Sequence, residues 1–204
     1  PIALFALMAA GLTSWSPSAE AQFATRFGAT RFPAIDVDNS DSLYLMMSVA
    51  TASDRPHSQI FFTMSRDSGT TWNNFPTTKN LSKSKGEAFG PSVAVTKNGV
   101  VRVYVVYHDD SNGITQSYLI RSKKKTKFKT KPVNITPHDG TAFSPRIALD
   151  SGEGLNIVWG DGKEPGGKIV YRRSTDQGTT FTDSLVVSGA STTAFEPEIA
   201  VDSQ

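Results

Sequence analysis

Four short segments that contain a proline recur along the chain at nearly even spacing. The segments are Phe32 to Asp38, Phe89 to Val95, Phe143 to Asp150 and Phe195 to Asp202. Their prolines are separated by 58, 54 and 52 residues. A repeat of about 50 residues that contains only short strand-like runs is typical of a β-propeller blade, a unit of four antiparallel strands.

Each repeat has the same internal order. A first strand is expected after the proline, and a second and a third strand follow it. The second strands are expected at Leu43 to Ala50, Val100 to Tyr107 and Leu155 to Trp159, and the third at Gln59 to Met64, Ile114 to Arg121 and Lys168 to Arg173. Asn80-Leu81-Ser82 and Asn134-Ile135-Thr136 recur 54 residues apart, at the expected end of an outer fourth strand.

These repeats predict an all-β fold, a β-propeller of four-stranded antiparallel blades. The blades are expected at about 31–88, 89–142 and 143–194, with the start of a fourth at 195–204. Propellers close with about four to eight blades. We therefore expect the chain to be a fragment, with about three blades plus one strand.

An eight-residue string occurs twice, each time after an expected third strand. Both copies read Ser-x-Asp-x-Gly-x-Thr-aromatic, and their defining residues are Ser65, Asp67, Gly69, Trp72, Ser174, Asp176, Gly178 and Phe181. The Asp carboxylate can accept hydrogen bonds from backbone N–H groups, and Gly can adopt a positive φ. The string therefore predicts a hairpin turn with a structural role. The middle repeat lacks it and reads Arg-Ser-Lys-Lys-Lys-Thr-Lys-Phe over Arg121 to Phe128.

The string resembles the Asp box of sialidase-like (BNR-repeat) β-propellers. This resemblance implies a six-bladed whole and an activity on glycans. The family opens its first blade with an aromatic-Arg-Ile-Pro motif, whose Arg grips the substrate carboxylate. Here Thr30-Arg31-Phe32-Pro33 matches the Arg and the Pro only. Asp54 matches the family's acid/base Asp, whereas the Tyr nucleophile and its Glu would lie beyond Gln204.

The face opposite the predicted turns carries the polar residues that could form a site. They are Arg31, Asp54, Arg55, His57, Glu87, His108, Asp109, Asp110, His138, Asp139, Arg146, Asp161, Glu164, Glu196 and Glu198. Arg31, Arg55 and Arg146 are the substrate-binding candidates and Asp54 is the catalytic candidate. Two of these candidates also have a structural alternative to a functional role. Arg31 could be a solvated residue at a strand end, and Asp54 could form a loop turn before Pro56. Asp109 and Asp161 each follow an aromatic residue by two positions, so a structural role is expected for both.

Charge is unevenly distributed. The run Arg121 to Lys131 holds seven Lys or Arg and no acid, although the whole chain has a net charge of only +2. This run could bind a polyanion, or its lysines could protect an outer edge strand from pairing. There is no cysteine, the three histidines are expected in loops and lack metal-ligand spacing, and no phosphate-binding loop or nucleic-acid module is visible. We therefore expect no metal, no cofactor and no nucleic-acid partner.

The N-terminal region reads as an export signal. Residues 2–12 are small and apolar, and Ala19-Glu20-Ala21 precedes Gln22. This pattern predicts a signal peptide over 1–21 and a partial propeller over 22–204, in a secreted or cell-envelope protein. The apolar run is too short to span a bilayer, and a short buried N-terminal segment is the alternative.

Two functions remain open on the sequence. The first is a binding module for glycans or cell-surface proteins, and the second is an exo-glycosidase of the sialidase type.

Overall fold

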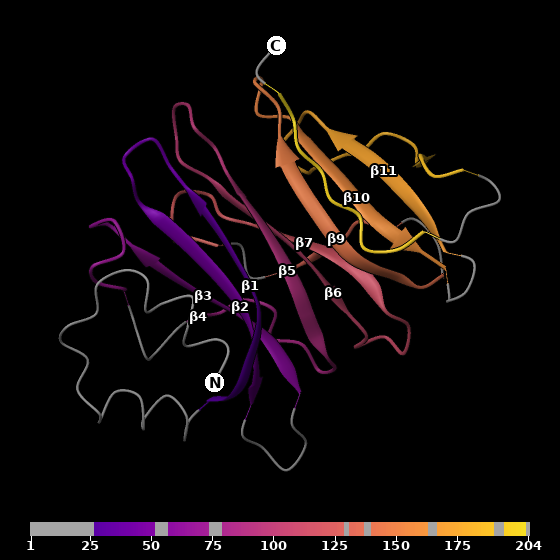
Figure 1. Ribbon diagram of the computed structural model, residues 1–204, viewed down its shortest axis with the longest axis horizontal. Coiled ribbons are helices and arrows are strands. Elements are labelled where there is room, and N and C mark those ends of the chain that lie inside the picture. Colours follow the sequence, from indigo (N-terminus) through magenta and orange to yellow (C-terminus); the bar gives the residue numbers. More distant parts are fainter. Residues whose placement is uncertain are drawn as a thin grey trace.

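The computed structural model describes residues 27–51, 57–73, 79–128, 131–136, 140–162, 167–189 and 194–202. All elements in these ranges are strands, and no helix there has the length and apolar character needed to cross a membrane. The strands form three four-stranded sheets in which neighbours pair antiparallel (Figure 1). This confirms the predicted all-β architecture of four-stranded antiparallel units.

The strands follow one another in each sheet in chain order. The first sheet contains β1 (Phe27–Val37), β2 (Leu43–Thr51), β3 (Ser58–Ser65) and β4 (Lys79–Asn80). The second contains β5 (Ala88–Val95), β6 (Val103–Asp109), β7 (Gln116–Arg121) and β8 (Val133–Asn134). The third contains β9 (Ala142–Leu149), β10 (Leu155–Asp161), β11 (Lys168–Ser174) and β12 (Leu185–Val186). The fourth strands are only two residues long, so the outer edge of each sheet is short.

The repeated prolines lie inside the first strands, at bulges. We expected each first strand to follow its proline, and this is wrong, because β1, β5 and β9 each begin several residues earlier. The pairing slips in the register where the proline sits. Bulges tolerate a proline because they already leave a ladder hydrogen bond unmade. The residue before each proline has a positive φ, namely Phe32 (51°), Gly90 (61°), Ser144 (48°) and Glu196 (50°).

The fourth proline segment does not form the expected strand. Residues 194–202 lie outside the strands of the three sheets, although the Ala194 N–H donates to the Gly167 carbonyl at 3.0 Å. The segment nevertheless contacts the first strand of the third sheet. The rings of Phe143 and Phe195 are stacked 6.0 Å apart, and Arg146 Nε lies 2.8 Å from Glu198 Oε1.

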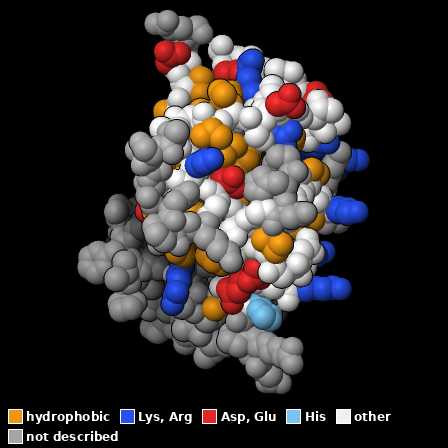
Figure 2. Space-filling view, turned by 90° about the vertical axis from the view of Figure 1, so that its right-hand side faces the viewer, with side chains coloured by type: hydrophobic (Ala, Val, Ile, Leu, Met, Phe, Trp, Pro, Cys, Tyr) orange, Lys and Arg blue, Asp and Glu red, His pale blue; other side chains and the backbone are white. Residues whose placement is uncertain are grey.

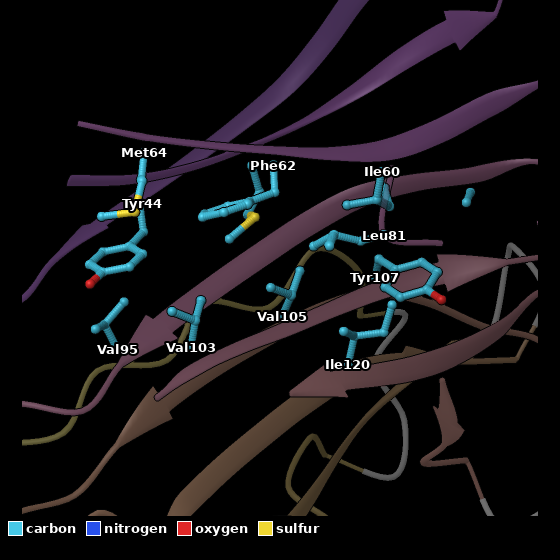
Figure 3. Close-up of a cluster of buried hydrophobic side chains, with 12 residues drawn as sticks. Tyr44, Ile60, Phe62, Met64, Leu81, Val95, Val103, Val105, Tyr107 and Ile120 are labelled. Atoms are coloured by element: carbon cyan, nitrogen blue, oxygen red, sulfur yellow. The ribbon is translucent and has the colours of Figure 1, made fainter. Parts of the chain in front are cut away.

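Two apolar clusters join the three sheets. Between the first and second sheets, Tyr44, Phe62 and Tyr107 pack with aliphatic residues of both sheets (Figure 3). Between the second and third sheets, Trp159 and Tyr104 belong to one cluster. Since β1 packs on β5 and β5 on β9, the first strands stand side by side across the molecule.

Apolar residues also lie on faces that no other described sheet covers. Leu45, Met47 and Val49 alternate with the residues of β2 that contact the second sheet, and they form a separate buried cluster with Phe61. On the third sheet, the side chains at 185–187 are about half exposed. Figure 2 views the molecule from this side and shows hydrophobic side chains gathered among polar ones, with Lys and Arg side chains along one margin.

The two Ser-x-Asp-x-Gly strings form equivalent turns after β3 and β11. Ser65 Oγ donates to Asp67 Oδ1 (2.7 Å) and accepts from the Gly69 N–H (2.8 Å). Ser174, Asp176 and Gly178 repeat both bonds at 2.8 Å. Hydrogen bonds from the Thr71 side chain and backbone lower the pKa of Asp67 to about 2. Both carboxylates are therefore hydrogen-bonded within their own turns.

Ser65→Ala should lower the free energy of unfolding by about 1–3 kcal/mol, because it leaves the buried Gly69 N–H without its acceptor. Urea denaturation followed by circular dichroism measures this. Binding of any ligand at the far end of the sheets should be unchanged. A variant that kept its stability but lost a ligand would show that the turn is a binding site.

Candidate functional site

The three sheets have two ends with different contents. Leu43 pairs with both Val37 and Ser65, so the first Ser-x-Asp turn lies where β1 ends. We call this the turn end. Arg31 pairs with Ser48 near the opposite end, where β1 begins and β2 finishes. We call this the loop end. The candidate residues were predicted opposite the turns. Arg31 lies near that end of its strand, whereas Arg146 pairs with Val158 in the middle of the third sheet.

Arg31 and Phe32 present a guanidinium and an aromatic ring to solvent at the loop end. Both are exposed, Phe32 by 55%, and Arg31 forms no hydrogen bond or ion pair in the described part of the chain. The Phe32 ring rests on Phe89 of the next first strand, with ring centroids 6.3 Å apart and planes inclined by 29°. The Phe32 ring is thus packed against Phe89 on one side, and about half of the side chain stays exposed to solvent.

Arg146 is partly committed to internal contacts. Its Nε lies 2.8 Å from Glu198 Oε1, and its Nη1 donates to the Pro145 carbonyl at 3.2 Å. A guanidinium has five N–H donors, so others remain for a ligand. Arg31 and Arg146 lie on the first and third sheets, and β5 of the second sheet stands between β1 and β9.

Asp54 and Arg55 lie outside the described residues, as do His138, Asp139 and Glu164. The structure therefore leaves Arg31 near the loop end of the first sheet and Arg146 in the middle of β9 on the third sheet. The roles predicted for Arg31, Asp54, Arg55 and Arg146 stay predictions. Asp109 behaves as expected for a structural residue, because its buried carboxylate accepts the Ser111 N–H at 2.8 Å.

The acidic residues beside the loop end have partners within the protein. Asp110 Oδ1 accepts the Glu87 N–H at 2.7 Å, and Glu87 Oε1 lies 3.9 Å from His57 Nδ1. Among the described residues, no group of three His, Asp or Glu side chains is placed to hold a metal ion.

One position of the second strand carries a different residue in each sheet. Its size limits which side chain fits at the paired position of the first strand. Arg31 pairs with Ser48, Phe89 with His108 and Phe143 with Gly160. A Cβ on Gly160 would lie 2.5 Å from the Phe143 ring, so only glycine leaves space for that ring. The first sheet alone places a charged side chain at the first-strand position.

Sequence reasoning placed His108 in a loop, and this is wrong. His108 lies in β6, is 5% exposed, and its ring contacts the Phe89 ring at a centroid distance of 3.8 Å. Burial lowers its pKa to about 4, and the nearby positive charge of Arg146 acts in the same direction. The imidazole is therefore neutral at pH 7. Its position in an uninterrupted apolar strand was the signal that could have predicted burial.

Ser48 and His108 both tie one sheet to the next. Ser48 Oγ accepts the Gly90 N–H at 3.2 Å, and His108 Nδ1 accepts the Ser144 N–H at the same distance. Gly90 and Ser144 are the residues with positive φ at the bulges. Side chains of the second strands thus hold the strained bulges of the neighbouring sheets.

The fold of this chain is similar to that of several solved structures, three of which are glycan-processing enzymes. The Hadza microbial sialidase Hz136 is 19% identical with a TM-score of 0.56, over 75% of this chain and 36% of that one. A Trypanosoma rangeli sialidase mutant with trans-sialidase activity is 17% identical with a TM-score of 0.53, over 76% and 30%. The Phanerochaete chrysosporium exo-β-1,3-galactanase is 10% identical with a TM-score of 0.54, over 78% and 36%. The chain has a sialidase- and glycosidase-like propeller fold.

At these identities the likeness shows the fold alone. The chain spans about a third of the length of these three proteins. No family model and no curated protein sequence matches it.

Proposed function

We propose that this chain is part of a secreted or cell-envelope β-propeller with Asp-box turns that binds glycans carrying an acidic sugar. Arg31 would hold the carboxylate of the sugar through paired N–H donors, and Phe32 would pack against its ring. A planar guanidinium matches a carboxylate in geometry, and an aromatic face accepts the apolar face of a sugar.

The observation that supports this most is the state of Arg31. It is exposed, it has no partner among the described residues, and it is followed in the chain by Phe32, whose half-exposed ring stacks on Phe89. The other two described first strands carry phenylalanine at the matching position. A charged residue that departs from a repeated scaffold is a better candidate for binding than one that recurs.

Arg31→Ala should weaken binding of sialyllactose by about ten- to a hundredfold, because a charge-assisted hydrogen-bond pair is lost. Calorimetry with sialyllactose and lactose measures this, and Arg31→Lys should recover only part of the affinity. Phe32→Ala should weaken both sugars.

The matched control is Arg66→Ala, which removes an exposed arginine at the turn end. Equal losses in Arg31→Ala and Arg66→Ala would show that only overall charge matters. Unchanged binding in Arg31→Ala would remove Arg31 from the site.

An exo-glycosidase of the sialidase type is the second candidate, and the two sialidases among the similar structures favour it. Arg31 would then position the substrate and Asp54 would serve as acid/base. A fluorogenic sialoside assay on the full-length protein separates the two functions. Turnover that disappears in both Arg31→Ala and Asp54→Ala would favour the enzyme, and absence of turnover alongside sialyllactose binding would favour the binding module.

A further inference from the structure

The turn after the third strand differs in charge between the sheets. In the first and third sheets it contains Asp67 and Asp176, whose carboxylates are hydrogen-bonded within the turn. In the second sheet the corresponding residues, 122–128, contain four lysines and no acid. We call these residues the lysine turn.

The backbone of the lysine turn is fixed by its own hydrogen bonds. Ser122 and Phe128 form a β-bridge, and Lys123 and Lys127 are joined by a backbone bond of 2.7 Å. Lys125 donates its N–H to the Val101 carbonyl at 2.8 Å. Its ammonium lies 3.5 Å from Asp38 Oδ2, a carboxylate of the first sheet that is itself buried. Lys125 therefore anchors the turn to the neighbouring sheet.

The remaining lysines of the turn carry charge that the described residues do not neutralise. Lys123, Lys124 and Lys127 are exposed and form no side-chain hydrogen bond or ion pair in the described ranges. Lys79 of β4 adds a fourth ammonium, since its Nζ donates to the Thr126 carbonyl at 3.4 Å. Like charges held on a fixed backbone repel one another, and a bound polyanion relieves this repulsion.

Protection of an exposed strand edge does not account for these lysines. The outermost strand of the second sheet is β8, which consists of Val133 and Asn134. The lysine turn precedes this strand in the chain and lies at the turn end of the sheet. Lysines that prevent pairing would be expected on the edge strand itself.

We propose that the lysine turn binds the sulfate or carboxylate groups of an acidic polysaccharide. Ammonium groups on flexible stems suit anions that are spaced irregularly along a polymer. The aromatic residue of the turn, Phe128, is partly buried, its ring contacts Phe62 at 5.0 Å, and Lys79 lies 5.5 Å from it. It is therefore not presented for stacking on bases or for insertion into a bilayer.

The lysine turn lies at the opposite end of the sheets from Arg31. Polysaccharide binding by this turn rests on the proposed function only in the choice of a glycan as partner.

The test measures binding of the purified protein to immobilised dextran sulfate at several salt concentrations. The triple substitution Lys123→Gln, Lys124→Gln and Lys127→Gln should weaken binding about tenfold and reduce its salt dependence. The matched control removes three exposed lysines elsewhere, Lys83→Gln, Lys85→Gln and Lys168→Gln, and changes the net charge equally. The control should bind within twofold of the unaltered protein.

Equal losses in the two triple variants, or no binding by the unaltered protein, would overturn the proposal. Binding of duplex DNA or of phosphatidylserine vesicles as tight as that of dextran sulfate, lost in the lysine-turn variant, would also overturn the assignment to a polysaccharide. Arg31→Ala should retain dextran sulfate binding. Failure of the sialyllactose experiment with intact lysine-turn binding would reject the loop-end site alone.

Discussion

Trp159→Ala should lower the free energy of unfolding by about 3–5 kcal/mol, the largest effect expected of any single substitution considered for this chain. Trp159 lies in the middle of β10 and is fully buried. It belongs to the cluster that joins the third sheet to Tyr104 and Leu119 of the second sheet. Removal of the indole would leave a cavity between two sheets, and paired strands on both sides limit how far that cavity can collapse.

A second variant at the same site separates packing from hydrogen bonding. The Trp159 Nε1 atom is buried and has no hydrogen-bond partner in the structure as described. Trp159→Phe keeps most of the apolar volume and removes this unsatisfied donor, so it should cost about 1 kcal/mol. Guanidinium denaturation followed by far-ultraviolet circular dichroism measures both variants. Equal losses in the two variants would show that the indole N–H contributes to stability in a way that its surroundings do not explain.

The sheet architecture was predictable because it is repeated. The strand-like runs that recur in each repeat gave three sets of strands, and the Ser-x-Asp-x-Gly strings marked two turns. Such signals are local, since they depend on residues that are neighbours in the chain or in one hairpin. The recurrent Asn-x-Ser/Thr segments located the short fourth strands β4 and β8 for the same reason.

The first strands were predicted less well because their geometry depends on the neighbouring sheet. A proline ordinarily disfavours the interior of a strand. Here the bulge before Pro91 is held by a hydrogen bond from Gly90 to Ser48 of another sheet. A Cβ at Gly90 would also lie 2.9 Å from the His108 ring, so the ring leaves little space for any other residue at this bulge. Neither contact can be read from the spacing of residues in one repeat.

In the candidate site, too, local features could be predicted from the sequence, whereas contacts between sheets could not. Arg31 was singled out because it departs from the repeat. It is exposed near the loop end, which is expected both of a binding residue and of a solvated strand end, so its role stays a prediction. The partial commitment of Arg146 to Glu198 was not predicted, because it depends on how residues 194–202 lie against β9. His108 was misplaced because the environment that buries it comes from two other strands, through Phe89 and Gly90 of β5 and Ser144 of β9.

The buried imidazole of His108 should make the stability of the protein depend on pH between about 4 and 6.5. In the unfolded chain a histidine has a pKa of about 6.5, whereas burial lowers the pKa of folded His108 to about 4. The unfolded state therefore binds the proton more readily throughout this range. The contribution of the neutral imidazole is fully present above pH 6.5 and is lost as the pH falls toward 4, by about 3 kcal/mol in total.

Geometry explains why the folded state resists protonation. His108 Nδ1 accepts the Ser144 N–H at 3.2 Å, and a proton on Nδ1 would remove this acceptor and oppose two N–H groups. His108→Gln removes the titrating ring but keeps a side chain that can accept a hydrogen bond. Other groups also titrate over this range, so the informative quantity is the difference in unfolding free energy between the unaltered protein and the variant, measured in urea from pH 4 to 7.5.

As the pH falls from 7.5 to 4, the difference in unfolding free energy between the unaltered protein and His108→Gln should change by about 3 kcal/mol, in favour of the variant. Ser48→Ala is the matched control, because Ser48 makes the equivalent bond between the first and second sheets and carries no titrating group. Its cost should be constant over the same pH values. A constant difference for His108→Gln as well would mean that the folded protein takes up the proton at His108 as readily as the unfolded chain, and that this histidine is not the neutral acceptor joining the second sheet to the third.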